Sequence, residues 1–87
     1  MWESGKFEID GLIFTYEAKV YAWGSELGIN GGRVSKLVIV RGDVIWDFNN
    51  TIVQYERGWV IEPKDDISKK ALEHVLKLYE VEASECC

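Results

Sequence analysis

Residues 14–22 read FTYEAKVYA, and the pattern in this stretch decides the class of fold. Apolar and aromatic side chains fall at every second position, and more polar side chains lie between them. The first set is Phe14, Tyr16, Ala18, Val20 and Ala22, and the second is Thr15, Glu17, Lys19 and Tyr21. A period of two places the two sets on opposite faces of a β-strand. The stretch therefore predicts a strand over residues 12–22 with one buried face and one wetter face.

Turn residues on both sides of this strand predict a series of antiparallel neighbours. Asp10-Gly11 favours a tight hairpin turn with a preceding strand at 6–9. Downstream, glycine- and asparagine-containing turns separate three more expected strands, at 33–40, 44–48 and 51–56. A two-residue turn at Asn49-Asn50 would pair the last two of these strands, with Val44 opposite Tyr55 and Trp46 opposite Val53.

From residue 65 the apolar period changes to that of a helix. One stripe of the helix is formed by Ile67, Ala71, Leu72, Val75, Leu76 and Tyr79. Asp65 and Asp66 suit the cap and the first turn, where the helix dipole favours negative charge. The sequence therefore predicts an α+β fold, an antiparallel β-meander of about five strands with one C-terminal α-helix over 65–80 packed on the face that carries Trp46, Val53 and Tyr55.

Length and composition bound the organisation of the chain. Its 87 residues are 47% hydrophobic, which is ample for one core, and we expect a single domain over 1–80. Residues 81–87 are expected to be an acidic, flexible tail, in which the adjacent Cys86 and Cys87 are free thiols. No apolar run approaches a membrane span, and the N-terminus has no apolar signal region, so we expect a cytoplasmic protein. The formal net charge of −5 disfavours direct nucleic-acid binding.

The glycine-rich stretch GINGGR, residues 28–33, is compatible with two interpretations. Its glycine spacing matches neither a P-loop nor a dinucleotide fingerprint, and a strand rather than a helix follows it. The first interpretation is a wide turn, in which Asn30, Gly31 and Gly32 supply positive φ angles. The second is a nest of backbone N–H groups beside Arg33 that binds a small anion or a carboxylate.

The chain offers few residues for catalysis. His74 is the single histidine, and its position near the edge of the helical stripe is typical of a boundary residue. No nucleophile–base pair and no set of metal ligands at a recognisable spacing is visible. We therefore expect a protein that is not an enzyme and that holds no cofactor or metal.

Surplus aromatic residues favour a binding role. Four tryptophans are many for so short a chain, and Trp23 and Trp59 each lie in an irregular segment that also holds an arginine. Tryptophan, tyrosine and arginine are the residues enriched at interface hot spots. The predicted partner-binding surface joins the loop from Trp23 to Arg33 with the Arg57-Gly58-Trp59 break. Four apolar residues are expected on the second sheet face, which one helix cannot also cover: Val38, Val40, Ile45 and Ile52. We therefore expect that this face or a sheet edge pairs with a second copy of the chain or with a partner.

Three segments resemble a family of small phage and prophage proteins for which no activity is established. They are the early tryptophan with GKFEI, the segment GINGGRVSKL, and YERGW followed by EP before the helix. The family usually has aspartate where Glu56 stands. The resemblance implies an accessory protein of a phage or mobile element in the bacterial cytoplasm. Small acidic proteins from that setting are often inhibitors of host defence, including anti-CRISPR proteins. This expectation comes from the setting alone, so it assigns no site residue in this chain.

Two classes of function follow. The first is a non-catalytic protein that binds a bacterial or phage protein and inhibits or modulates it. The second is a binder of a nucleotide or small anion that uses Asn30, Gly31, Gly32 and Arg33. No membrane partner is expected for either class.

Overall fold

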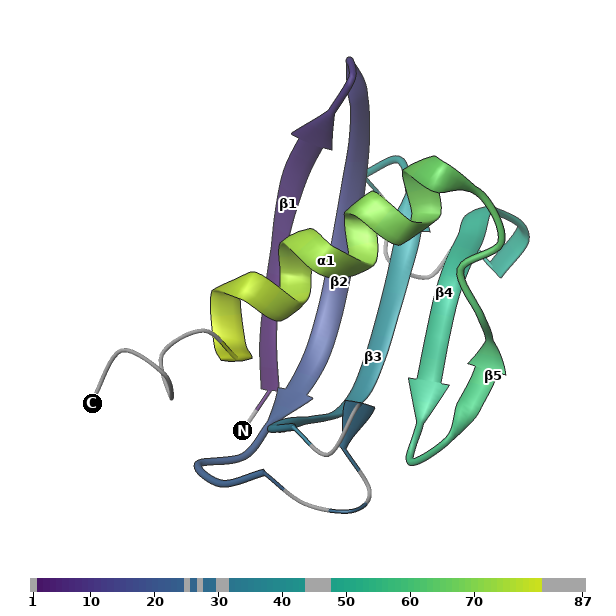
Figure 1. Ribbon diagram of the computed structural model, residues 1–87. Coiled ribbons are helices and arrows are strands. Elements are labelled where there is room, and N and C mark those ends of the chain that lie inside the picture. Colours follow the sequence, from purple (N-terminus) through teal and green to yellow (C-terminus); the bar gives the residue numbers. More distant parts are fainter. Residues whose placement is uncertain (1, 25, 27, 30–31, 44–47, 81–87) are drawn as a thin grey trace.

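The computed structural model describes residues 2–24, 26, 28–29, 32–43 and 48–80. Within these residues, five strands form one antiparallel sheet in the order of the chain: β1 (Trp2–Ile9), β2 (Leu12–Val20), β3 (Val34–Arg41), β4 (Thr51–Glu56) and β5 (Trp59–Ile61). A 3-10 turn, η2 (Phe48–Asn50), precedes β4, and the helix α1 (Asp66–Glu80) follows β5 and crosses one face of the sheet (Figure 1). The predicted α+β meander with one C-terminal helix is confirmed.

The segment before β4 differs from the expectation. Residues 44–47 lie outside the described part of the chain, and Phe48, Asn49 and Asn50 form η2 instead of a strand end and a hairpin turn. Tyr55, for which we expected Val44 as partner, has Leu37 of β3 on one side and Trp59 of β5 on the other. A strand has only two edges, so the predicted pairing at Tyr55 is wrong. The fifth strand of the sheet is Trp59–Ile61, which is not among the strands that we expected from the sequence.

The missed strand follows a tight turn at Arg57-Gly58. The Glu56 N–H donates to the Gly58 carbonyl over 2.9 Å, and the Arg57 φ angle is 60°, in the left-handed region that few side chains adopt. Arginine at that position concealed the positive φ, because glycine or asparagine is its usual signal, so the sequence indicated a break here but not a hairpin. The predicted Asp10-Gly11 hairpin does carry this signal, and its φ angles of 53° and 82° are those of a type I′ turn.

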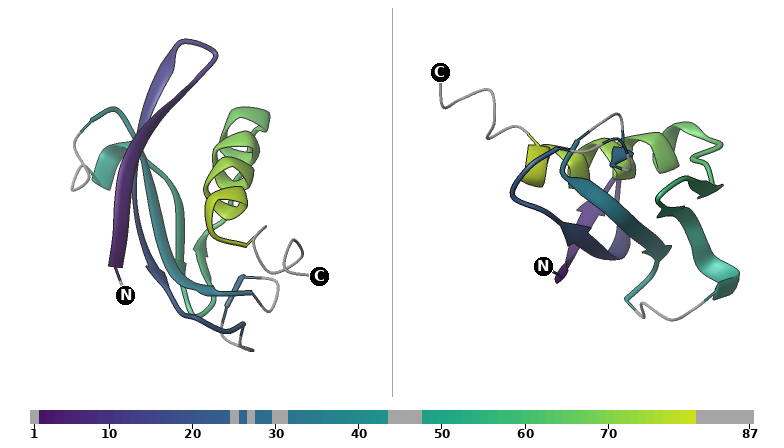
Figure 2. Two further views of the ribbon diagram at one scale, coloured as in Figure 1. Left: turned by 90° about the vertical axis from the view of Figure 1, so that its left-hand side faces the viewer. Right: turned by 90° about the horizontal axis from the view of Figure 1, so that it is seen from below.

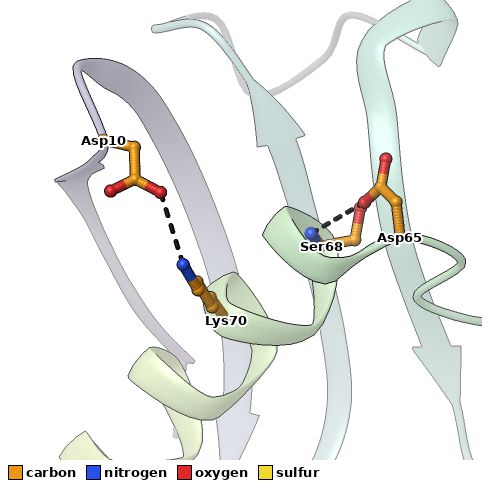
Figure 3. Close-up of polar contacts among 4 residues, drawn as sticks. All are labelled: Asp10, Asp65, Ser68 and Lys70. Carbon is orange, nitrogen blue, oxygen red and sulfur yellow. Dashed lines mark hydrogen bonds and ion pairs between the residues drawn. The ribbon is translucent and has the colours of Figure 1, made fainter.

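The helix begins and is placed as the sequence indicated. The Asp65 carboxylate accepts a hydrogen bond from the Ser68 N–H over 2.9 Å (Figure 3). Hydrogen bonding to the Ser68 side chain, and next to the Ser68 backbone, lowers the pKa of Asp65. One turn later Lys70 forms an ion pair with Asp10 of the β1–β2 hairpin over 3.4 Å. The cap fixes where α1 starts, and the ion pair joins α1 to the distant end of β1.

The core lies between α1 and one face of the sheet (Figure 2). Phe14, Tyr16, Ala18 and Val20 of the alternating stretch are all buried, whereas Ala22 lies beyond β2 and is exposed. Val53 and Tyr55 of β4 belong to the same core, as predicted, and Trp46 lies outside the described residues. The helix contributes Ala71 and Val75, fully buried, with Leu72 and Leu76 half-buried beside them.

The second sheet face is less apolar than the sequence pattern indicated. The pairing of β3 with β4 shifts after Ile39, because Ile39 lies opposite Val53 and Val40 lies opposite Thr51. Ile52 is therefore the extra residue of a bulge, and it packs against the core instead of the second face. Val40 is fully buried and Ile45 lies outside the described residues. Val38 is half-buried. The described residues therefore do not decide whether this face pairs with a second copy, and the homodimer stays a prediction.

Candidate binding surface at the loop end of the sheet

One end of the sheet gathers the irregular segments that the sequence singled out. Here β1 begins, β2 passes through a long loop into β3, and β4 turns into β5 (Figure 1). We call it the loop end; the opposite end carries the β1–β2 hairpin and the connection from β3 to β4. Among the described residues, the aromatic side chains that are strongly exposed all belong to the loop end: Trp2 (54%), Tyr21 (41%), Trp23 (82%) and Trp59 (40%). Exposed aromatic area of this kind is typical of an interaction surface.

Arg33 closes the neck of the β2–β3 loop. Its Nε donates to the Tyr21 carbonyl over 2.9 Å, and the Tyr21 N–H donates to the Arg33 carbonyl over 3.0 Å. These two bonds hold the ends of the loop together and leave Trp23 projecting from it. Arg33 thus lies at the predicted surface, but part of its guanidinium is used to build the loop.

The glycines of GINGGR allow close contact between backbone segments. A Cβ atom on Gly28 would lie 1.9 Å from the Gly32 carbonyl oxygen, which is far inside van der Waals contact. The Gly32 N–H donates to the Ile29 carbonyl over 2.9 Å, and the Ile29 side chain is buried in the core. These contacts show a tight turn that closes at Gly32, but they do not test the positive φ angles expected at Asn30, Gly31 and Gly32. Asn30 and Gly31 lie outside the described residues, so the anion-nest hypothesis stays a prediction.

The β4–β5 turn lies beside the start of β3. The Arg57 N–H donates to the Ser35 carbonyl over 3.0 Å, which joins the turn to the strand that leaves the β2–β3 loop. Arg57 itself is exposed. Trp59 packs edge-on against the Tyr55 ring, with 5.0 Å between ring centroids, and so lies on the side of the sheet that faces α1. The two predicted segments thus belong to one end of the molecule.

A row of side chains that the sequence analysis did not connect crosses the other side of this end. The register places Trp2 opposite Lys19, Lys19 opposite Lys36, and Lys36 opposite Glu56. The Lys19 Nζ lies 5.8 Å from the centroid of the Trp2 ring and 5.6 Å from that of Tyr21, within reach of a cation–π interaction with both. The Lys36 Nζ lies 3.7 Å from the Glu56 Oε1.

The sequence held part of the signal for this row. Lys19 and Tyr21 fall on the wetter face of the alternating strand, so their common side was predictable. Trp2 and Lys36 could be added only after the register between strands was known. The contact with Lys19 lowers the pKa of the Tyr21 phenol, and the Ser35 side chain and the positive charge of Arg57 lower it further.

Other chemically capable groups are occupied in packing. The His74 ring is exposed and stacks on Phe7 at a centroid distance of 4.4 Å, which fits the predicted boundary role. The Tyr16 and Tyr79 hydroxyls share a hydrogen bond of 2.6 Å between β2 and α1. Within the described residues no three His, Cys, Asp or Glu side chains gather as a metal site, and Cys86 and Cys87 lie outside them.

A shallow depression of about 300 Å³ lies on the same sheet face as the row, because its lining residues Ser4 and Glu17 are two positions from Trp2 and Lys19 on the same strands. Its lining includes Lys6, Thr15, Glu17 and Asp43. Thr15 already donates its hydroxyl to the Gly42 carbonyl over 2.7 Å. The lining shows no nucleophile beside a base, so we assign no reaction to it.

Comparison with known proteins places the chain in a family. Residues 1–80 match the family described as "Domain of unknown function (DUF7678)". The chain belongs to this family. The match spans the whole sheet and α1, so the fold described here is that of the family domain. No curated protein and no solved structure matches the chain. No helix among the described residues of this family member is long and apolar enough to cross a membrane.

Proposed function

We propose that this protein is a non-catalytic binding protein whose loop end contacts another protein. The observation that carries the proposal is the gathering of Trp2, Tyr21, Trp23 and Trp59 at one end, all of them strongly exposed. Exposed indole and phenol rings are costly in water and stabilise an interface when a partner covers them. The arginines beside them, Arg33 and Arg57, are the other residue type enriched at hot spots.

The biological setting of the proposal comes from the resemblance in sequence. The segments GKFEI, GINGGRVSKL and YERGW resemble small phage and prophage proteins. We infer that the protein acts in the bacterial cytoplasm, where it binds a bacterial or phage protein. Blocking a defence system, as anti-CRISPR proteins do, is the activity that best fits a small acidic protein in that setting.

Trp23 is the side chain from which we expect the largest single contribution. It is 82% exposed, so truncation removes a contact and leaves the core unchanged. Trp23→Ala should weaken partner binding by roughly 1–3 kcal/mol, which is about fivefold to 150-fold in Kd. The matched control is Ile13→Ala, because Ile13 is 50% exposed and lies beside the hairpin at the opposite end of the sheet.

The experiment first captures the partner protein and then measures its affinity for this chain. The tagged protein is used as bait in lysates of phage-infected bacteria, and the captured protein is purified and titrated by calorimetry. Arg57→Asn is the second variant, because asparagine tolerates the positive φ of that position better than alanine. Full affinity in both Trp23→Ala and Arg57→Asn would exclude this surface. A thermal shift with nucleotides, lost in Arg33→Gln, would favour the small-anion function instead.

A further inference from the structure

The side of the loop end that faces away from α1 carries a concentration of positive charge. Lys19 of β2 and Lys36 of β3 lie opposite each other there, and the Arg57 backbone bonds to Ser35, the residue before Lys36, in a chain whose formal net charge is −5. Glu56 is the acidic member of the same cross-strand row, and its carboxylate is already held by Lys36 at 3.7 Å. Lys19 has no acid opposite it, since its neighbours across the strands are Trp2 and Lys36.

The Lys19 ammonium is fixed between two aromatic rings. Trp2 and Tyr21 lie at 5.8 and 5.6 Å from the Nζ atom, and both rings are strongly exposed. The rings stabilise the position of the cation without neutralising it, because a cation–π contact is an attraction to a quadrupole and brings no countercharge. The pKa of the Tyr21 phenol is lowered first by its contact with Lys19, then by the Ser35 side chain and by the positive charge of Arg57.

The geometry distinguishes between two kinds of anion. A nucleobase binds an aromatic platform through the flat face of the ring. At this site Lys19 lies over the Trp2 and Tyr21 rings, so a cation already occupies part of the platform that a base would stack on. The overall negative charge of the chain also repels a polyanion that extends past the site. Carboxylates on a short acidic segment do not need to stack on the rings and extend little past the site. A short acidic segment therefore fits the site better than a nucleic acid does.

We propose that the Trp2–Lys19–Tyr21 cluster, with Lys36 and Arg57 beside it, is a recognition site for an acidic segment of the partner protein. Aspartate or glutamate side chains of that segment contact Lys19 and Arg57, and its apolar or aromatic side chains cover the exposed rings. This inference rests on the proposed protein-binding function and names the chemistry of the partner. It assigns the role of anchor to Lys19, which nothing in the sequence pattern alone distinguishes from other surface lysines.

The test uses defined probes and needs no knowledge of the partner. Fluorescein-labelled octapeptides of alternating glutamate and tyrosine, and of alternating glutamine and tyrosine, are titrated with the protein by fluorescence anisotropy. A single-stranded thymidine oligonucleotide of similar length is the nucleic-acid probe. We expect the glutamate peptide to bind about tenfold tighter than the glutamine peptide at low salt. Binding should weaken as the salt rises from about 0.01 M to about 0.1 M, where the Debye length falls from about 30 to about 10 Å.

Charge-neutral variants then locate the site. Lys19→Met keeps the unbranched stem and removes the ammonium, and it should weaken binding of the glutamate peptide about fivefold or more. Lys64→Met is the matched control, because Lys64 is exposed just before α1 and should change affinity less than about twofold. Circular dichroism and the melting temperature of each variant show that the fold is retained.

Each other outcome overturns the inference. Equal affinity for the two peptides, no binding of either, tighter binding of the oligonucleotide, or equal effects of Lys19→Met and Lys64→Met would each exclude an acidic-segment site. Self-association of the chain that depends on Lys19 would identify a second copy as the occupant instead. A captured partner whose binding depends on Trp23 but not on Lys19 or salt would overturn this inference and leave the proposed function intact.

Discussion

Replacing Val75 with alanine should destabilise the fold by about 2 kcal/mol. Val75 is fully buried where α1 meets the sheet, and the change removes two methyl groups from that contact. Transfer of two methylene equivalents accounts for about 1.6 kcal/mol, and the remaining cavity raises the cost to about 2.5 kcal/mol. Alanine has the better helix propensity, which offsets about 0.5 kcal/mol. The net loss is a large fraction of the stability expected for a domain of this size.

The control for this prediction is Leu78→Ala on the same helix. Leu78 is 45% exposed, so its truncation should change the free energy of unfolding by less than about 0.5 kcal/mol. Urea denaturation followed by circular dichroism measures both variants. With a slope of about 1 kcal/mol per molar urea, the midpoint should fall by about 2 M for Val75→Ala and by less than about 0.5 M for Leu78→Ala. Similar shifts for the two variants would refute the packing of α1 described above.

Two further predictions concern the loop and the alkaline limit of stability. Gly28→Ala should remodel the β2–β3 loop, because the added Cβ would lie 1.9 Å from the Gly32 carbonyl oxygen. Thermal melting should show a lower midpoint for this variant, and an unchanged midpoint would show that the loop can adjust. Burial, and next the hydrogen bond with Tyr16, raises the pKa of Tyr79, so its contribution to stability is present below about pH 10 and is lost as the pH rises above that value. Urea midpoints from about pH 8 to about pH 11 should therefore decline less in Tyr79→Phe than in the unaltered protein, and an equal decline would assign the loss to other groups.

Local sequence patterns predicted most of the fold because they show which face of a strand or helix is buried and where that element begins or ends. The alternation in residues 14–20 identified the buried side of β2, and the stripe with Ala71 and Val75 identified the buried side of α1. Asp65 was recognised as the cap because an acid before a helical period has a local physical role. Prediction failed at η2 and β5, where Asn49-Asn50 resembled a hairpin turn and Arg57 adopted a positive φ without a glycine.

The candidate site was predicted in part for the same reason. Trp23, Arg33, Arg57 and Trp59 stood out as aromatic residues and cations in irregular segments, and the structure places both segments at the loop end. The use of Arg33 as a loop clamp was not visible, because its acceptor is the Tyr21 carbonyl and a backbone oxygen leaves no trace in a sequence. The role of Ile52 was also hidden, since a bulge breaks the alternation without a marker residue.

The sequence by itself determined the fold class, the buried face of each long element, the hairpin at Asp10-Gly11 and the start of α1. Each of these depends on residues within a few positions of one another, where side-chain period, φ preference and capping act directly. Only the tertiary structure decided the register in which neighbouring strands pair, and hence that Trp2, Lys19 and Lys36 form one row. Register is a relation between distant segments, and it is set by how the whole apolar surface packs together and not by any one segment.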